Sequence, residues 1–341
     1  MQHNHTPLLE GRHLDIGYRN GKQCRTIQSS LNFTLQRGKL ACLLGPNGIG
    51  KSTLLRTLSA AQPALKGQLL LEGNPLHSYT LRERSRKIGI VLTDRTRTGG
   101  LTVRETASLG RYPYTGFFGK LTPADRDAVE QALQATGIAH KASEYMSTLS
   151  DGERQKVMIA KALAQECPLI LLDEPTAFLD VVSRLEILAL LHRIAADSDK
   201  AILLSTHEVE QSLMLADCLW LLSPDGLACG ATEDLVLDGS LQRLFPSHRV
   251  CFDSLSGTYL PQSPSHGPAA VVEAASPLLG HWARNALARQ GYRCLPATCT
   301  APNILRIASP ACLTWQTEGK QATFASFGEW QEALRHERNP G

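Results

Sequence analysis

The sequence lacks the patterns typical of disulfide-rich or membrane-spanning proteins. Its nine cysteines are scattered, no C-x-x-C pair occurs, and the closest two are Cys294 and Cys299. Such spacing argues against a disulfide framework or a zinc ribbon and favours reduced thiols in the cytosol. No apolar run approaches the roughly 20 residues that cross a bilayer, and the polar residues 1–13 contain no signal-peptide core. We therefore expect a soluble chain that reaches a membrane only through a partner.

An excess of charge of one sign is also lacking. The 341 residues carry 35 Lys+Arg against 32 Asp+Glu, a net charge of +3. This argues against a chain dedicated to nucleic acid, and we expect no nucleic-acid partner. What is present is a composition that folds, with 43% hydrophobic residues in a length typical of about two domains.

Short apolar segments alternate with helix-like segments along the first part of the chain. This alternation favours a mostly parallel α/β sheet with its ligand at the carboxyl ends of the strands. Residues 101–165 have a helical pattern, in which Thr122 is a cap and Pro123 occupies the first helical position. The expected strands are 31–35, 40–44, 67–72, 87–92, 168–172, 201–206 and 218–222.

The composition changes near residue 246. Residues 254–270 are rich in Ser, Pro and Gly, which is typical of a linker. Beyond them, a strand at 270–274, an amphipathic helix at 278–289, two or three strands within 303–326 and a helix at 329–335 predict a small α+β domain. We expect a first domain at 1–250, a linker at 251–270 and an accessory domain at 271–341.

A phosphate-binding loop is indicated by GPNGIGKS, which matches G-x-x-x-x-G-K-[ST] between an expected strand and helix. The glycines let backbone N–H groups converge on phosphate oxygens, and the following helix points its positive dipole end at the same anion. Lys51 would reach the β- and γ-phosphates, and Ser52 would offer its hydroxyl to Mg²⁺. A chance glycine turn is the alternative interpretation. The residues expected to bind nucleotide are Gly45, Pro46, Asn47, Gly48, Ile49, Gly50, Lys51, Ser52 and Thr53.

An acidic pair follows the buried segment 168–172. Asp173 would hold Mg²⁺, and Glu174 would polarise the attacking water. Alone, the pair is an ordinary polar strand end. Together with the phosphate loop, it predicts a nucleotide hydrolase.

LSDGE at 149–153 reads first as a capping box, because Ser150 caps a helix and Glu153 reaches back. The helix start also leaves N–H groups for a phosphate. Here the sequence resembles the ATP-binding cassette (ABC) ATPases, whose signature is usually LSGGQ. The motif order agrees over about residues 8–245: phosphate loop, signature, LILLDEP at 169–175, FLD at 178–180, and His207 after the next strand.

The resemblance implies a P-loop NTPase ABC cassette, with a RecA-like mixed sheet, an antiparallel β subdomain and a helical subdomain at about 95–165. It also implies a homodimer that sandwiches each ATP between the phosphate loop of one chain and the signature of the other. Ser150 and Gly152 would contact the γ-phosphate, with Asp151 and Glu153 beside them.

Three further residues match the family pattern. Asp180 resembles the aspartate that couples the two sites, and His207 resembles the histidine that senses the γ-phosphate. Tyr18 matches the aromatic residue that stacks on adenine. The alternatives are a satisfied buried histidine and a strand-edge tyrosine.

Two departures from the family pattern matter. Thr93, with Asp94 beside it, stands where a glutamine normally binds Mg²⁺ and water. Asp151 and Glu153 place negative charge in the signature, which should weaken triphosphate binding unless the charge points away or caps the helix.

Residues 101–125 resemble the helical subdomain of importer ATPases for iron–siderophores, haem and cobalamin, where a G-R-x-P segment recurs. This implies a subunit on the cytoplasmic face of a bacterial inner membrane that drives a separate permease, supplied by a periplasmic binding protein. Residues 82–111 also hold eight basic side chains against three acidic ones. We expect this surface to dock the permease, and a merely solvated face is the alternative.

Two other functions compete with import. A soluble cassette protein of translation or DNA repair usually carries two cassettes or a long coiled-coil insertion, neither of which is seen here. An exporter ATPase often carries fused membrane helices, which are also lacking.

Overall fold

The computed structural model describes residues 6–21, 23–92, 100–116, 119–247, 250–261, 267–317 and 319–338. The chain divides into two compact units. One comprises the chain up to Pro246 together with Phe252–Thr258, and the other comprises Ser247–Cys251 and the chain from Tyr259 onward. Within the described ranges, no helix is long and apolar enough to span a membrane.

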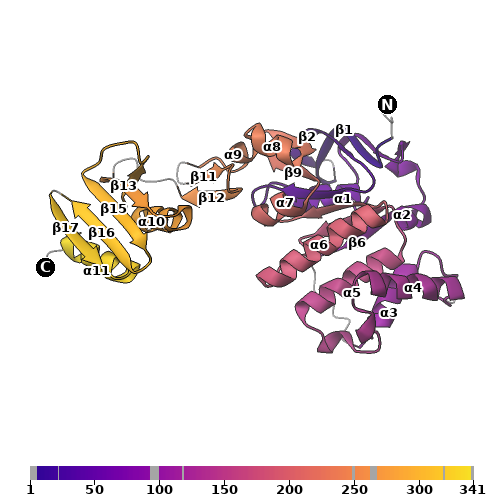
Figure 1. Cartoon of the computed structure of the whole chain (residues 1–341). Helices are drawn as coiled ribbons and strands as arrows, with labels where there is room; N and C mark the ends of the chain where they lie inside the picture. The colour runs from indigo at the N-terminus through magenta and orange to yellow at the C-terminus, as the bar shows by residue number, and fades with distance from the viewer. Residues whose placement is uncertain are drawn as a thin grey trace, which may run out of the picture. The chain divides into compact units, whose positions relative to one another are not determined.

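A six-stranded sheet forms the centre of the first unit (Figure 1). Its order is β10-β9-β3-β8-β7-β6, in which β10 is antiparallel to β9 and the other five strands are parallel. The middle strands β3, β8 and β7 are apolar and almost entirely buried, as strands covered on both faces must be. The bounds are β3 Leu40–Leu44, β6 Ile88–Val91, β7 Leu169–Asp173, β8 Ala201–Ser205, β9 Cys218–Ser223 and β10 Gly226–Ala231.

A second, antiparallel sheet has the order β2-β1-β4-β5. Its apolar residues share one core with α1 and the central sheet, and the rings of Phe33 and Trp220 lie 4.6 Å apart between the two sheets. The helix that follows the phosphate loop is therefore fixed by apolar packing on both sides. The bounds are β1 Leu9–Asn20, β2 Gln23–Leu35, α1 Lys51–Leu58, β4 Lys66–Leu71 and β5 Asn74–Pro75.

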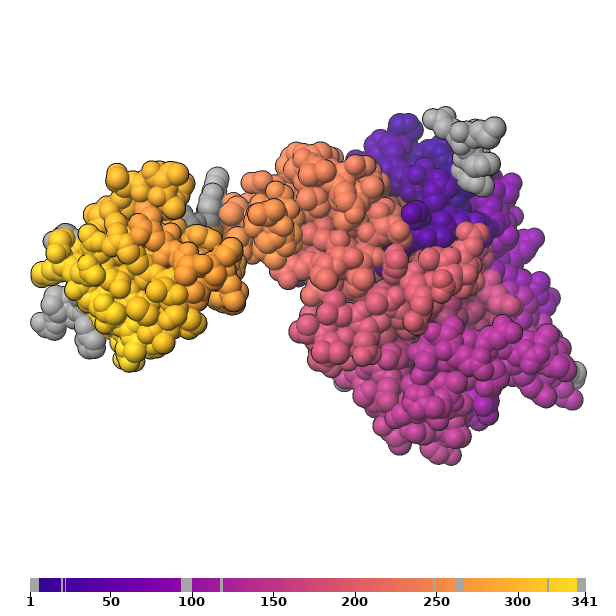
Figure 2. Space-filling model, viewed as in Figure 1, coloured from indigo at the N-terminus to yellow at the C-terminus, as the bar shows by residue number. Residues whose placement is uncertain are grey.

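Helices α3, α4 and α5 pack together as a helical subdomain (Figure 1). Each begins with a capping box, and Thr122 with Pro123 starts α4 as the sequence predicts. Figure 2 shows this subdomain, coloured magenta, as a continuous surface of the first unit. The bounds are α2 Leu81–Lys87, α3 Val103–Ser108, η2 Leu109–Arg111, α4 Pro123–Ala135, η3 Ala139–Lys141, η4 Met146–Thr148 and α5 Asp151–Ala164.

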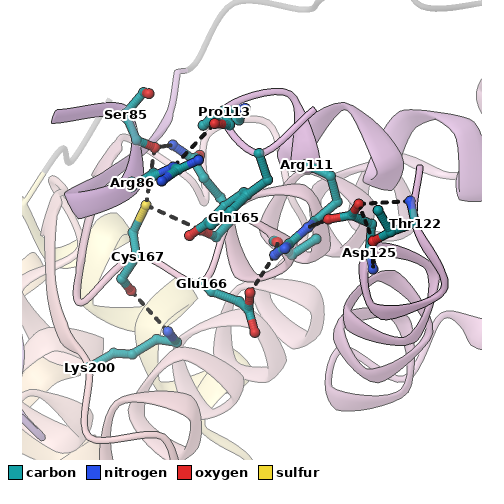
Figure 3. Close-up of polar contacts among 12 residues, drawn as sticks. Ser85, Arg86, Arg111, Pro113, Thr122, Asp125, Gln165, Glu166, Cys167 and Lys200 are labelled. Carbon is teal, nitrogen blue, oxygen red and sulfur yellow. Dashed lines mark hydrogen bonds and ion pairs between the residues drawn. The ribbon is translucent and has the colours of Figure 1, made fainter. Parts of the chain in front are cut away.

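Arg111 corrects one expectation about the basic segment. Its side chain is only 6% exposed, so it does not belong to a docking surface. Its guanidinium lies between Asp125 of α4, at 2.8 Å, and Glu166 after α5, at 2.5 Å, and also donates to the carbonyl oxygen of Ala164 at 2.8 Å (Figure 3). Three acceptors satisfy one buried cation and join the start of α4 to the end of α5.

Tyr114 extends this contact toward the central sheet. The guanidinium groups of Arg111 and Arg86 lie 4.0 and 4.7 Å from its ring centroid, and its hydroxyl donates to the carbonyl oxygen of Gln165 at 3.0 Å. Gly110 is required here because a Cβ would lie 2.1 Å from the carbonyl oxygen of Lys161. The Gly110–Tyr114 segment therefore packs against the end of α5 and also contacts Arg86 of α2, which precedes β6. Two of the eight basic residues expected at the docking surface, Arg95 and Arg97, lie outside the described residues.

Four helices complete the first unit: α6 Val181–Asp197, α7 Val209–Leu215, α8 Thr232–Leu237 and α9 Ser240–Leu244. The strands β11 Val250–Asp253 and β12 Thr258–Pro261 pair with each other and connect the two units along the chain. The expected linker at 251–270 thus contains strand structure, because β12 pairs with β11 and β13 begins at Ala269.

The second unit is a five-stranded sheet with order β14-β13-β15-β16-β17 and two helices. Its own core joins α10 and α11 to the sheet, with the rings of Trp315 and Trp330 5.8 Å apart. The predicted α+β character is therefore seen. The bounds are β13 Ala269–Ala274, α10 Pro277–Arg289, β14 Arg293–Leu295, β15 Asn303–Ser309, β16 Cys312–Thr317, β17 Lys320–Phe324 and α11 Phe327–Arg338.

Candidate functional site

The loop between β3 and α1 has the shape that its glycines permit. Gly50 caps α1 with φ of 115°, a left-handed conformation that side chains rarely adopt. At Gly45, a Cβ would lie 2.4 Å from the carbonyl oxygen of Leu222. The turn between Gly45 and Gly50 consists of the remaining expected residues, Pro46, Asn47, Gly48 and Ile49. Of these, Asn47 and Gly48 are exposed.

Lys51 points back into this loop. Its Nζ donates to the carbonyl oxygens of Gly45 at 2.7 Å and Pro46 at 3.2 Å. Burial lowers the pKa of the Lys51 ammonium, while the Glu174 and Asp173 carboxylates oppose that change. The cation is thus held at the mouth of the loop, where the backbone N–H groups of the α1 start also converge.

Two side chains outside the motif support the loop. Tyr18, at the end of β1, is 46% exposed, and its hydroxyl hydrogen-bonds the hydroxyl of buried Thr53 at 2.9 Å. Gln28, on β2, is buried and donates through Nε2 to the carbonyl oxygens of Ile49 and Ser223, at 3.2 and 3.1 Å. The sequence indicates Tyr18 but not Gln28, whose only signal is a polar residue on the inner face of a strand.

The carboxyl end of β7 lies beside the phosphate loop. Asp173 Oδ1 accepts from Ser205 Oγ at 2.6 Å, and Ser52 Oγ lies 3.4 Å away from the same oxygen. Ser205 is the last residue of β8 and is fully buried. Sequence reasoning missed it, although its position at a strand end is the same signal that singled out Asp173.

Glu174 is held in a strained backbone conformation, with φ of +46°. Its N–H donates to Ser205 Oγ at 3.0 Å, so one serine hydroxyl contacts both members of the acidic pair. Its Oε1 lies 2.5 Å from His207 Nε2. The structure therefore links Asp173 and Glu174 through Ser205, and Glu174 to His207.

The signature segment begins α5 as a complete capping box. Ser150 N and Oγ donate to Glu153 Oε2 at 2.9 and 3.0 Å, and Glu153 N donates to Ser150 Oγ at 3.3 Å. The capping interpretation is therefore correct. Gly152 faces α6, because a Cβ there would lie 3.3 Å from Ser183 Oγ.

Asp180 caps α6 on the other side of that contact. It accepts from Ser183 N and Oγ, both at 2.9 Å, and these hydrogen bonds lower the pKa of its carboxyl group. Arg184 follows in the same turn, donates to the carbonyl oxygen of Leu179 at 2.8 Å and forms an ion pair with Glu208. No motif pointed to Arg184. Thr93 and Asp94 lie outside the described residues.

Comparisons with known proteins identify this arrangement. The family model described as "ABC transporter" matches residues 28–177. The ferric enterobactin transport ATP-binding protein FepC of Escherichia coli is 35% identical over 254 residues, which cover 74% of this chain and 92% of FepC. The chain belongs to the ABC transporter ATP-binding proteins.

Other similar proteins agree with this assignment. The iron(3+)-hydroxamate import ATP-binding protein FhuC of Bacillus subtilis is 39% identical over 204 residues, 60% of this chain and 74% of FhuC. A solved ABC transporter in an inward-facing conformation is 28% identical with a TM-score of 0.62, covering 75% of this chain and 98% of that one. The fold is the expected ABC cassette, followed by a second unit, and the protein is an ATPase that drives transport.

Proposed function

We propose that this ABC protein is the ATP-hydrolysing subunit of an importer for an iron–siderophore, haem or cobalamin-type substrate. It would work on the cytoplasmic face of a bacterial inner membrane, through a separate permease supplied by a periplasmic binding protein. The observation that carries the proposal is the likeness to FepC, which extends over 92% of that siderophore transport protein. Relatives named for hydroxamate and cobalamin import support the same substrate class.

The site residues have complementary roles in this proposal. The Gly45–Thr53 loop and Lys51 bind the phosphates, and Tyr18 stacks on adenine while its hydroxyl is held by Thr53. Glu174 acts as general base toward the attacking water, and its contact with His207 fixes its orientation. Ser205 positions the acidic pair through its hydroxyl group, which donates to Asp173 and accepts from the Glu174 N–H.

The donor set fits Mg²⁺. Ser52 Oγ and Asp173 Oδ1 are oxygen ligands 3.4 Å apart, and Mg²⁺ in nucleotide sites usually takes one or two protein oxygens with phosphate and water oxygens. The ion would neutralise charge on the β- and γ-phosphates. In the same proposal, Thr93 would supply a further oxygen ligand to Mg²⁺.

We also propose that two copies form the functional unit. Ser150 and Gly152, with Asp151 and Glu153 beside them, would face the γ-phosphate of ATP held by the other copy, and Asp180 would couple the two sites. Within one chain Ser183 contacts Asp180 and lies beside Gly152, so the proposed signature and coupling residues are neighbours. The proposed division is a cassette at 1–250, a connection at 251–270 and an accessory domain at 271–341.

Uptake in a deletion strain tests the substrate class. Cells lacking the gene are supplied with ferric siderophores, haem and cobalamin, and are complemented with the wild type or with Glu174→Gln. We expect only the wild type to restore uptake of one of these compounds. Purified Glu174→Gln should bind ATP normally, while its turnover falls by orders of magnitude, as for loss of a general base, about 10²–10⁴-fold. Normal turnover would refute the role of Glu174, and normal uptake of all three compounds in the deletion strain would refute the importer assignment.

A further inference from the structure

Two carboxylates occupy the first turn of α5, beside the residues proposed to face a γ-phosphate. Asp151 is the first residue of the helix and Glu153 the third. Two negative charges at this position would repel an incoming triphosphate. Each, however, is paired with a cation: Lys141 Nζ lies 2.8 Å from Glu153 Oε1, and Arg154 Nη1 lies 3.1 Å from Asp151 Oδ1.

Glu153 uses both of its oxygens. Oε2 accepts the two hydrogen bonds from Ser150, and Oε1 accepts the one from Lys141 at the end of η3. The Lys141 hydrogen bond, followed by those from Ser150, lowers the pKa of Glu153 to about 2. The carboxylate is thus ionised, and its charge is balanced locally.

The partners are themselves held in place. Arg154 donates through Nε to the carbonyl oxygen of Met146 at 3.0 Å and through Nη2 to that of Ser147 at 3.1 Å. The Lys141 and Glu153 side chains are only 26% and 28% exposed. The Lys141–Glu153 pair therefore keeps a defined geometry in which solvent screening is weaker than for a fully exposed pair. The Arg154–Asp151 pair, with side chains 40% and 47% exposed, is screened more strongly.

We propose that Lys141 is a positioning residue that neutralises Glu153, so that the start of α5 can accept the γ-phosphate of ATP bound to a second copy of the chain. Lys141, Arg154, Asp151 and Glu153 together carry no net charge. Glu144, 3.6 Å from Lys141, adds one carboxylate that lies outside the first turn of α5. Without Lys141, an uncompensated negative charge would lie in the signature turn. This inference rests on the proposed dimer.

A glutamine at position 153 separates charge from structure. Glutamine also completes a capping box with Ser150, but it carries no charge. If Lys141 acts by neutralising Glu153, its removal should be harmful when residue 153 is glutamate and harmless when it is glutamine. If Lys141 only braces η3, the nature of residue 153 should not matter.

The test measures ATP-driven dimerisation of the full chain in a Glu174→Gln background, by light scattering with Mg²⁺ and increasing ATP. Lys141→Met should raise the dimer dissociation constant about tenfold per signature site, and therefore about a hundredfold for two sites, with tenfold corresponding to about 1.4 kcal/mol. Binding of a fluorescent ATP analogue to the single subunit should change less than about twofold, because the phosphate loop is untouched.

Two further variants complete the cycle. Lys141→Met with Glu153→Gln should restore dimerisation to the parent level. Glu153→Gln alone should lower the ATP requirement, because it removes one negative charge from the signature turn and leaves Lys141 with only its more distant partner, Glu144. The matched control is Arg104→Met, which removes a cation from the 2.6 Å pair with Glu130 on α3 and α4 without touching the signature residues.

The outcomes are distinct. If the Glu174→Gln parent does not dimerise with ATP, the proposed dimer fails. If the parent dimerises and Lys141→Met matches it, or if Glu153→Gln gives no rescue, the inference is wrong. If Lys141→Met does not fold, Glu153→Gln decides: a lower ATP requirement supports neutralisation, and an unchanged or higher one overturns it.

Discussion

Replacing Arg111 by alanine tests whether this side chain holds the start of α4 to the end of α5. The substitution removes the guanidinium from Asp125, from the carbonyl oxygen of Ala164 and from Glu166. Asp125 is the critical partner because its side chain, like that of Arg111, is only 6% exposed. The variant therefore leaves a buried carboxylate without its cation.

The magnitude follows from these exposures. Removing one member of a buried ion pair costs about 3–5 kcal/mol, because the remaining charge is uncompensated. Asp125 keeps its hydrogen bonds from Thr122 N and Oγ, at 2.9 and 2.6 Å, so we expect the lower end. The contact with Glu166, whose side chain is 56% exposed, adds less than about 1 kcal/mol. A loss of about 3 kcal/mol should lower Tm by about 6–12 °C in a unit of this size.

Calorimetry of the full chain measures the Tm of the first unit directly. The control is Arg104→Ala, which breaks an exposed pair with Glu130 in the same subdomain and should cost less than about 1 kcal/mol. Adding Asp125→Asn to Arg111→Ala removes the stranded charge and should recover part of the loss. If Arg111→Ala lowers Tm no more than Arg104→Ala does, the buried contacts of Arg111 do not stabilise the first unit as we expect.

Three further predictions concern the site. Tyr18→Ala should weaken ATP binding by about 5- to 150-fold, since stacking is worth about 1–3 kcal/mol per base. Tyr18→Phe should retain most of the affinity in a binding titration, and equal losses would contradict stacking. Ser205→Ala should lower kcat by about 10–100-fold, because the lost hydroxyl orients the metal ligand Asp173. ATP affinity should stay nearly unchanged, and an unaltered kcat would disprove the role of Ser205. Because the folded-state pKa of Glu153 is about 2, below its usual 4.5, its stabilisation is complete above that usual value and is lost as the pH falls toward 2. The difference in urea midpoint between wild type and Glu153→Gln should therefore shrink from pH 7 to acid, and a constant difference would refute this.

The sequence predicts what is contiguous and chemically unusual. The phosphate loop is such a feature, because glycines, a lysine and a hydroxyl must follow one another to surround a phosphate. The buried strands β3, β7 and β8 are equally predictable, since parallel strands covered on both faces need uninterrupted apolar residues. Glu174 and His207 follow the neighbouring parallel strands β7 and β8, so the strand order alone places them at the same edge of the sheet.

What escapes prediction is the support supplied by ordinary residues that are distant in sequence. Gln28 is 21 residues from Ile49, and Ser205 is 32 residues from Asp173. The sequence places Arg111 in a basic segment and so predicts an exposed side chain. Three acceptors from α4 and the end of α5 make its burial favourable instead. Only the fold brings those acceptors together, so neither charge nor periodicity could reveal them.

The first turn of α6 joins two sites that the motifs treat separately. Ser183 contacts both Asp180 and the position of Gly152 in the signature, whereas Arg184, the next residue, binds Leu179 and Glu208. Glu208 follows His207, which contacts Glu174. A shift of this turn must therefore alter contacts at the signature and at the base of the same subunit. In the proposed dimer the signature would serve the other copy's nucleotide, so this turn would lie between the base of its own site and a contact with the other site.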